Sequence, residues 1–261
     1  MVISTTIHSK NIEEIVVTGT KSKTQIINET GNLTFISNEE INFINPTHPS
    51  NVLNRMPGVF ISQGSGQEHL TSIRSPVLSG GAGAGSFLYL EDGIPLRSPG
   101  FSNVNGLMES NIEISERTEV IRGPGSVLYG SNAVHGLVNV ITEKENADYN
   151  NKLNIRAGRN KIFFKSSTYK ELESSNLLFN FLWKEDNGYT NNYTEQNSDK
   201  FDKPHYGQQK FLIRLNTEKN SKNYIFILSG TNLNQETMGY IKVYQYFKDK
   251  RIKYKNPDPE A

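Results

Sequence analysis

The segment from Glu119 to Thr142 constrains the fold more than any other part of the chain. It holds two short runs rich in β-branched residues, 120–121 and 137–142, and the connection between them is rich in glycine and proline. Glycine allows positive φ and close backbone approach, and proline fixes φ. The spacing therefore predicts a strand, a tight turn, a short segment at Leu128-Tyr129 and a second strand, packed as one unit.

The residues upstream of that unit carry signals for short helices and strands. Residues 33–36 form a run typical of a strand, and Ser37 followed by Glu40 predicts a helix N-cap with a capping box. This helix should end before Asn45-Pro46, because the residue before a proline avoids the α region. A second short helix is expected around 52–56, ended by a Pro-Gly pair. Short strands mixed with short helices predict an α+β globule.

Five motifs in this half of the chain resemble, in order, parts of the plug domain of TonB-dependent outer-membrane receptors. They are similar to the TonB box, a helix with its following turn, an arginine-bearing strand, a hydrophobic strand with an Asp-Gly turn, and the glycine-rich unit above. The motifs lie at residues 12–19, 52–59, 71–74, 87–96 and 119–142. Ser75 and His135 stand where the family commonly has glycine, which indicates a subfamily variant.

The second half of the chain alternates between apolar and more polar residues from Lys152 onward. The clearest runs are 177–183, 211–215 and 224–228, with aromatic residues near the expected strand ends. A strand that spans a bilayer needs ~9–11 residues, and this alternation is that of a transmembrane β-barrel. We count five or six such strands, with residues 186–207 long enough for an extracellular loop. A small soluble β-domain would alternate in the same way, so the pattern alone leaves that alternative open.

Together these patterns predict an α+β plug domain followed by antiparallel β-strands of an incomplete transmembrane β-barrel. The expected divisions are a flexible lead at 1–11, the plug at 12–145 and the start of the barrel at 146–261. Plugged outer-membrane transporters close with 22 strands, which need more than about 400 residues. Only about 115 residues follow position 145. We therefore expect the chain to be the N-terminal part of a receptor.

Composition excludes several classes of function. The net charge of +1 provides no global field that would attract nucleic acid or anionic lipid. Cysteine is absent, so thiolate metal sites, cysteine nucleophiles and disulfides are excluded. The sequence has no apolar run long enough for a transmembrane helix. Residues 1–10 lack the basic and apolar regions of a secretory signal peptide, which an outer-membrane protein needs.

The clearest functional motif is the run of six residues Glu13, Glu14, Ile15, Val16, Val17 and Thr18. A β-branched run with free edges suits strand addition to a partner's sheet, where main-chain hydrogen bonds supply the affinity. The resemblance implies that this segment binds the periplasmic domain of TonB, which is energised by an inner-membrane complex. The alternative is that the run forms the first strand of the plug sheet, or alternates between the two roles.

Two arginines, Arg74 and Arg122, each end a β-run of the plug-like region. The resemblance implies that they contact carboxylates on the inner wall of the barrel, a task that suits the forked guanidinium. Two alternatives are a solvated position, and pairing with Glu116 or Glu119 inside the plug.

The glycine-rich run at 80–85 does not fit a phosphate-binding loop, because no helix or P-loop lysine follows it. The resemblance implies that loops here and nearby face the ligand. The candidate ligand-side residues are Ser79, Gly81, Gly83, Arg97 and Phe101. A long hairpin connection with no ligand role is the alternative.

No catalytic constellation emerges from the sequence, so we expect no enzyme activity. The five histidines are scattered without metal-ligand spacing and are expected to be polar packing residues, so we predict neither a metal site nor a cofactor. The resemblance implies a receptor in the cell outer membrane, with the TonB box facing the periplasm. Its plug would gate energy-coupled import of a small ligand such as an iron–siderophore chelate. A non-transporting binding or structural module is the alternative.

Overall fold

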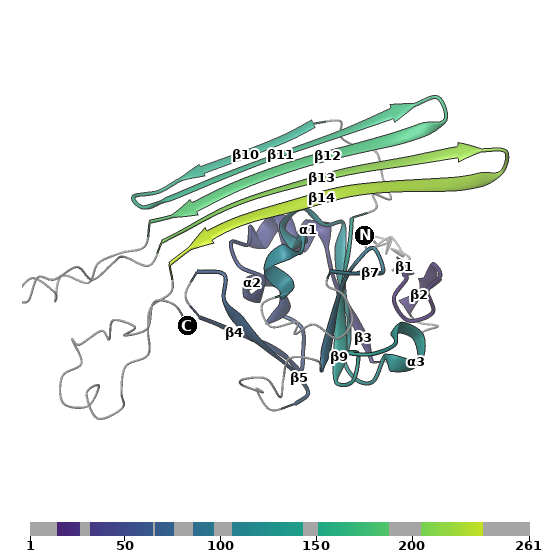
Figure 1. Cartoon of the computed structure of the whole chain (residues 1–261), viewed down its shortest axis with the longest axis horizontal. Helices are drawn as coiled ribbons and strands as arrows, with labels where there is room; N and C mark the ends of the chain where they lie inside the picture. Colours follow the sequence, from purple (N-terminus) through teal and green to yellow (C-terminus); the bar gives the residue numbers. More distant parts are fainter. Residues whose placement is uncertain are drawn as a thin grey trace, which may run out of the picture.

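The computed structural model describes residues 15–26, 32–64, 66–75, 86–96, 106–142, 151–187 and 205–236. The described residues up to 142 form an α+β body. Those from 151 onward form a long five-stranded sheet, here called the wall. Figure 1 shows the wall lying across one side of the body and extending beyond it at both ends. The predicted order of an α+β globule followed by antiparallel strands is confirmed.

A five-stranded sheet in the order β3-β8-β9-β6-β7 forms the centre of the body. Its strands are β3 (Leu33–Ser37), β6 (Phe87–Glu91), β7 (Ile94–Pro95), β8 (Arg117–Ile121) and β9 (Gly136–Ile141). Neighbouring strands are antiparallel except β6 and β9, which are parallel. The predicted unit of residues 119–142 is confirmed, because it contains the paired strands β8 and β9 with the short helix α3 (Ser126–Tyr129) between them.

The start of β9 shows why this unit is rich in glycine. A Cβ atom on Gly136 would lie 2.8 Å from the carbonyl oxygen of Ile121 and 3.0 Å from the side chain of Ile73. Real Cβ contacts to backbone are not this short, so any other residue would push neighbouring strands apart. Gly130, which ends α3, has a φ of 77°, a conformation that glycine adopts without strain.

The first helix follows its sequence signals. Helix α1 (Asn38–Ile44) begins after Ser37, whose side chain accepts from the backbone N–H of Glu40 while the Glu40 side chain accepts from the Ser37 backbone. Asn45, with a φ of 49°, ends the helix just before Pro46. The capping box and the proline-limited end are both confirmed.

The remaining elements of the body are short. They are β1 (Ile15–Val16), β2 (Thr24–Gln25), α2 (Ser50–Leu53), β4 (Val59–Gln63), β5 (His69–Ile73) and the 3-10 helices η3 (Gly106–Glu109) and η4 (Ile112–Ile114). Strands β1 and β2 form one two-stranded sheet, and β4 and β5 form another. The main core lies between the central sheet, α1, α2 and the β4–β5 hairpin, and includes Ile41, Leu53, Ile61, Leu107 and Val138.

The wall is a meander of five antiparallel strands. They are β10 (Asn151–Ala157), β11 (Lys161–Leu172), β12 (Ser175–Asp186), β13 (Tyr206–Lys219) and β14 (Lys222–Gln235). The two-residue turn between β13 and β14 has positive φ at both Asn220 and Ser221, as in the type I′ turns that fit twisted hairpins. The predicted loop between β12 and β13 lies, at residues 188–204, outside the described residues.

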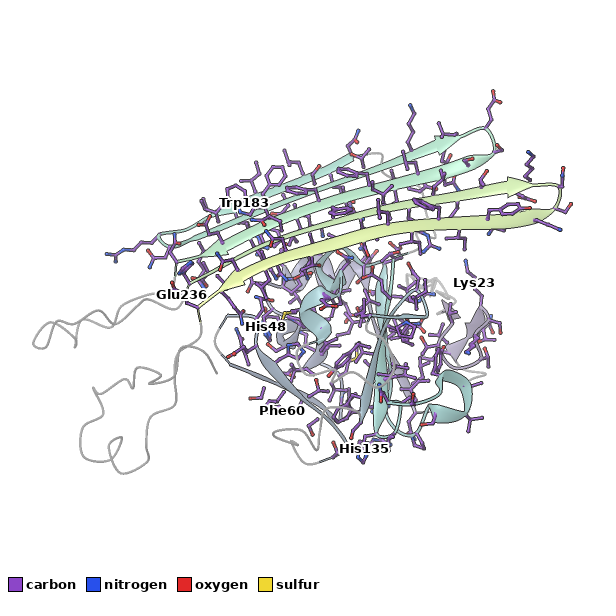
Figure 2. The ribbon with its side chains drawn as sticks, viewed as in Figure 1. Lys23, His48, Phe60, His135, Trp183 and Glu236 are labelled. Atoms are coloured by element: carbon purple, nitrogen blue, oxygen red, sulfur yellow. The ribbon has the colours of Figure 1, made fainter. Side chains whose placement is uncertain are left out.

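Side chains of the wall alternate between its two faces as predicted. On β12, Leu178, Asn180, Leu182 and Lys184 are buried, whereas Phe179 between them is exposed. Figure 2 shows side chains of the wall in the space between the wall and the body, with Trp183 on the other side of the sheet. Among the described residues, no helix combines the length and apolar character needed to span a membrane.

Candidate functional site

The body and the wall meet through charged and polar side chains. Cationic residues on the inward face of the wall reach the body, among them Arg156, Lys165, Lys184, Lys210 and Arg214. Their partners lie on the short segments that connect the strands of the body. The contact therefore depends on segments whose positions are fixed by the central sheet.

Glu113 is the centre of this contact. It lies on η4 with only 1% of its side chain exposed, and its carboxylate pairs with the Nζ atoms of Lys184 at 2.6 Å and Lys210 at 3.0 Å. Burial by itself raises the pKa of Glu113, but the two ammonium charges outweigh burial and lower the pKa to about 2. Glu113 is therefore ionised at neutral pH.

The lysines have more donors than one carboxylate can accept, and backbone carbonyls of the body accept the others. Lys184 also donates to the carbonyl oxygen of Thr47 at 2.8 Å, and Lys210 donates to that of Ser110 at 2.6 Å. Lys165 donates to the carbonyl oxygen of Glu113 at 2.6 Å. The residues around η3 and η4 thus form a polar seat for the inward lysines of three neighbouring strands.

A second ion pair joins the two parts at Asp92. The Nη1 atom of Arg214 lies 2.6 Å from Asp92 Oδ2, and Asp92 Oδ1 accepts from the backbone N–H of Thr142 at 2.8 Å. Asp92 itself has a φ of 48° in the Asp-Gly turn after β6. The sequence identified the Asp-Gly dipeptide at Asp92 as a turn signal only. It did not show that the carboxylate of Asp92 binds Arg214 of the wall.

Two histidines lie beside the lysine cluster as neutral packing residues. His48 and His69 are buried, with ring centroids 6.0 Å apart, and His69 also lies against Tyr89. Burial is the main cause that lowers the pKa of each to about 4, and the charges of nearby Lys184 and Lys210 act in the same direction. Both are polar packing residues, as predicted. Among the residues that the structure describes, no three His, Asp or Glu side chains are grouped to hold a metal ion.

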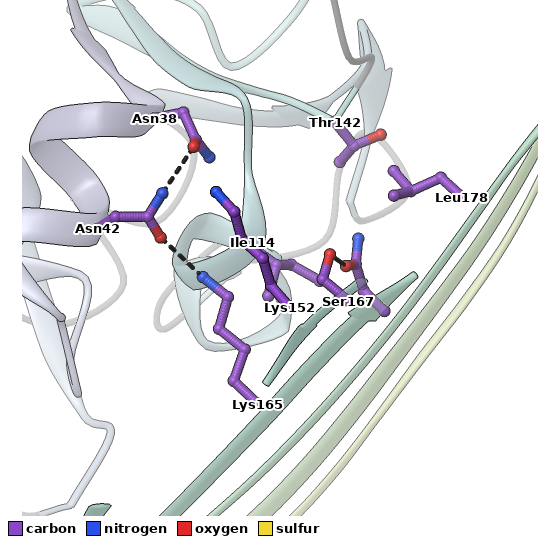
Figure 3. Close-up of a pocket in the computed structure, with 9 residues that line it drawn as sticks. Asn38, Asn42, Ile114, Thr142, Lys152, Lys165, Ser167 and Leu178 are labelled. Carbon is purple, nitrogen blue, oxygen red and sulfur yellow. Dashed lines mark hydrogen bonds between the residues drawn. The ribbon is translucent and has the colours of Figure 1, made fainter. Parts of the chain in front are cut away.

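A cavity of about 20 Å³, lined mostly by polar residues, lies between the body and the wall beside η4 (Figure 3). Lys152, Lys165 and Asn180 are among its lining residues, and the side-chain nitrogen of Asn180 has no hydrogen-bond partner. This volume is enough for one water molecule. It is far below the several hundred Å³ of a small-molecule site.

The last two residues of the predicted TonB box, Val17 and Thr18, are anchored to the face of the central sheet that points away from the main core. The backbone N–H of Thr18 donates to Glu119 Oε2 at 2.7 Å, and that of Val17 lies 3.1 Å from both carboxylate oxygens. Strand β1 pairs with β2 and not with the central sheet. Of the six predicted box residues, Glu13 and Glu14 lie outside the described residues.

Arg74 and Arg122 lie next to each other, since a Cβ on Gly58 would approach both side chains. Arg122 donates to the carbonyl oxygens of Pro57 at 2.9 Å and Asn32 at 3.4 Å. Burial lowers the pKa of Arg122, and the charge of Arg74 lowers it further. Their contact with carboxylates of a barrel wall stays a prediction.

Glu119, considered above as an internal partner for the two arginines, instead pairs with Arg117, whose Nε lies 2.6 Å away. The five candidate ligand-side residues Ser79, Gly81, Gly83, Arg97 and Phe101 lie outside the described residues. Their role also stays a prediction. The ion pairs to Lys184, Lys210 and Arg214 could not be found from sequence, because their partners are about 70 to 120 positions away.

Comparison with known proteins matches this architecture to one family. The model of the TonB-dependent Receptor Plug Domain matches residues 25–137. The vitamin B12 transporter BtuB of Vibrio vulnificus (strain CMCP6) is 31% identical over 157 residues, which cover 58% of this chain and 25% of the relative. The chain thus spans about a quarter of the length of this curated relative.

Solved receptor structures share the fold. The ferripyoverdine receptor of the outer membrane of Pseudomonas aeruginosa superposes with a TM-score of 0.62 at 14% identity, covering 86% of this chain and 28% of that receptor. The ferric-catecholate import receptor Fiu from E. coli K12 gives 0.59 at 15% identity, covering 81% and 28%. Residues 25–137 therefore match the plug domain of TonB-dependent receptors, and the antiparallel strands that follow share the fold of the receptor structures.

Proposed function

We propose that this chain is the gate region of a TonB-dependent outer-membrane receptor that imports a scarce small ligand. The observation that carries the proposal is the docking of the plug against the inward face of the wall through Glu113 and its two buried lysines. A plug held inside a barrel must be kept in place by contacts with the wall and must still present its N-terminal segment to the periplasm. The division of the chain at about residue 145 is part of this proposal.

The outer side of the wall supports a membrane position for these strands. Large apolar side chains on this side are exposed, among them Phe179, Phe211, Phe226 and Leu228. Apolar residues that face outward and alternate with inward polar ones are typical of a strand in contact with lipid. The proposed location is therefore the outer membrane, with residues 13–18 on the periplasmic side for TonB to bind.

The proposed ligand class is a ferric siderophore. The receptor structures that share the fold are described as ferric-siderophore receptors, whereas the relative of 31% identity is a vitamin B12 transporter. Cobalamin is therefore the second candidate. Ligand contacts would come from plug loops, including Ser79, Gly81, Gly83, Arg97 and Phe101, and from the barrel.

Uptake by cells that carry the full receptor gene tests the proposal. We expect cells to accumulate either a radiolabelled ferric siderophore or radiolabelled cyanocobalamin, and deletion of residues 13–18 should abolish accumulation while leaving surface binding intact. Deletion of residues 2–7 is the control and should have no effect. Uptake that continues after loss of residues 13–18 would contradict TonB dependence, and a receptor found in the soluble fraction would favour the non-transporting module.

A further inference from the structure

We propose that Glu119 positions the TonB-binding segment. Its buried carboxylate holds Val17 and Thr18 against the plug and so fixes the point on the plug surface from which the preceding part of residues 13–16 extends. This inference rests on the proposed function, in which residues 13–18 bind TonB. It adds a residue that lies 101 positions after Thr18 and determines how the segment is presented.

The carboxylate of Glu119 forms a complete binding site for two consecutive backbone N–H groups. Its side chain has no exposed surface. Oxygen Oε2 accepts from the N–H and from the hydroxyl of Thr18, and both oxygens lie 3.1 Å from the N–H of Val17. Arg117 pairs with Oε1 at 2.6 Å and balances the charge. Hydrogen bonds to an ionised acceptor are about twice as strong as neutral ones. The carboxylate of Glu119 therefore holds the docked segment more firmly than a neutral acceptor would.

Two further side chains complete the anchor around Thr18. Tyr129 of α3 donates its hydroxyl to the carbonyl oxygen of Thr18 at 2.9 Å, and Asn139 of β9 donates to its hydroxyl oxygen at 3.0 Å. Glu119 and Asn139 are partners across the β8–β9 ladder. The anchor is therefore built on the glycine-rich unit of residues 119–142.

This anchor divides the predicted TonB box into two parts. The N–H groups of Val17 and Thr18 are committed to Glu119, whereas β1, at Ile15–Val16, pairs along one edge with β2, its one partner strand among the described residues. A partner that adds a strand needs a free edge. Val16 is also buried, so with the anchor closed TonB can add a strand only to residues that precede Val16, and a pull on that segment acts on Thr18 and Glu119.

Distance measurements between two spin labels in the full receptor test the role of Glu119. Ser22, in the turn between β1 and β2, and Val127, on α3, are both exposed, and the chain has no cysteine, so each can be replaced by a labelled cysteine. The parent should give one narrow distance distribution. In Glu119→Gln the undocked, broad fraction should rise at least about tenfold, because charge-assisted bonds become neutral ones.

Two variants separate positioning from general stability. Thr18→Val keeps the backbone bonds and should raise the undocked fraction less than Glu119→Gln does. Val138→Ala removes core packing on the face of β9 opposite to the anchor and should lower the melting temperature without broadening the distances. A distribution in Glu119→Gln equal to that of the parent, or equal to that of Val138→Ala, would overturn the proposal.

The same samples separate failure of this inference from failure of the proposed function. The distances are measured without TonB, so they report on the anchor alone. Binding of the purified TonB C-terminal domain is then measured on parent and Glu119→Gln receptors. Broadened distances with no TonB binding to either receptor would refute the partner and retain the anchor, whereas unchanged distances refute the anchor even if TonB binds.

Discussion

Glu113 shows how much of the plug–wall contact depends on one side chain. It is the carboxylate partner of both Lys184 and Lys210, and each of these lysines has at most 2% of its side chain exposed. A buried ion pair adds little net stability over a well-packed apolar contact, but removal of one partner leaves an uncompensated charge. Here the loss of one carboxylate would leave two such charges on neighbouring strands.

Replacement of Glu113 by Gln should therefore destabilise the receptor by about 3 kcal/mol or more, within the range measured when one partner of a buried pair is removed. The readout is thermal unfolding of the full receptor in detergent. Asp186→Asn is the matched control, because its partner Lys161 is largely exposed and a surface pair contributes at most about 1 kcal/mol. Equal effects of the two replacements would show that Glu113 does not hold the plug.

The buried histidines predict how stability depends on pH. The pKa values of His48 and His69 are lowered from 6.5 to about 4, so the unfolded chain binds protons in this range before the folded one does. Stability is then fully present above pH 6.5 and falls as the pH drops toward 4, by about 1.4 kcal/mol per pH unit for each histidine. Glu113, with its pKa lowered to about 2, adds a further loss below about pH 4.5.

Unfolding measured between pH 7 and pH 4.5 tests this dependence. Replacing both His48 and His69 by Gln should flatten the curve between pH 6.5 and 4.5, even if stability at pH 7 is lower. His205→Gln serves as control, because its side chain is 39% exposed. A parent whose stability does not change over this range would contradict the burial of neutral histidines.

At the scale of elements, the sequence predicted the helix ends and turns that depend on residues close to one another in the chain. The capping box at Ser37, the end of α1 before Pro46 and the strand–turn–strand of residues 119–142 all depend on neighbours within a few positions. The alternation along the wall likewise follows from the two-residue period of a strand. Two features could not be predicted, because they depend on contacts between distant segments. They are the parallel pairing of β6 with β9 and the binding of wall lysines by backbone carbonyls around η3 and η4.

The segment around β1 provides a test at this scale. A peptide of residues 10–20 should bind the TonB C-terminal domain, and Val16→Pro should abolish binding, because proline removes a ladder N–H and fixes φ. Isothermal titration calorimetry measures both. In a free peptide no contact with Glu119 exists, so Thr18→Val should bind as the parent peptide does. Binding of the proline peptide with unchanged affinity would rule out strand addition.

For the whole molecule, the plug and the wall depend on each other. The wall brings inward lysines that pair with Glu113 of the plug, and large apolar side chains are exposed on its other face. Sequence predicted this division of faces but did not identify the cations of the wall, and the contact of Arg74 and Arg122 with barrel carboxylates stays a prediction. In the described strands the cations lie on the wall and the carboxylates of Asp92 and Glu113 lie on the plug.

Expression of residues 1–261 alone, behind an added signal peptide, should not restore ligand uptake in a strain that lacks the receptor. The five described strands form an open sheet whose outer edges, on β10 and β14, have no neighbouring strand among the described residues. Unpaired backbone N–H and C=O groups are costly in lipid, and exposed edges promote aggregation. We therefore expect inclusion bodies or degradation, detected by fractionation and immunoblotting.

The full receptor gene behind the same signal peptide is the control and should restore uptake. Uptake by residues 1–261 alone would refute the argument, because a working pore would then form from too few strands to close a barrel.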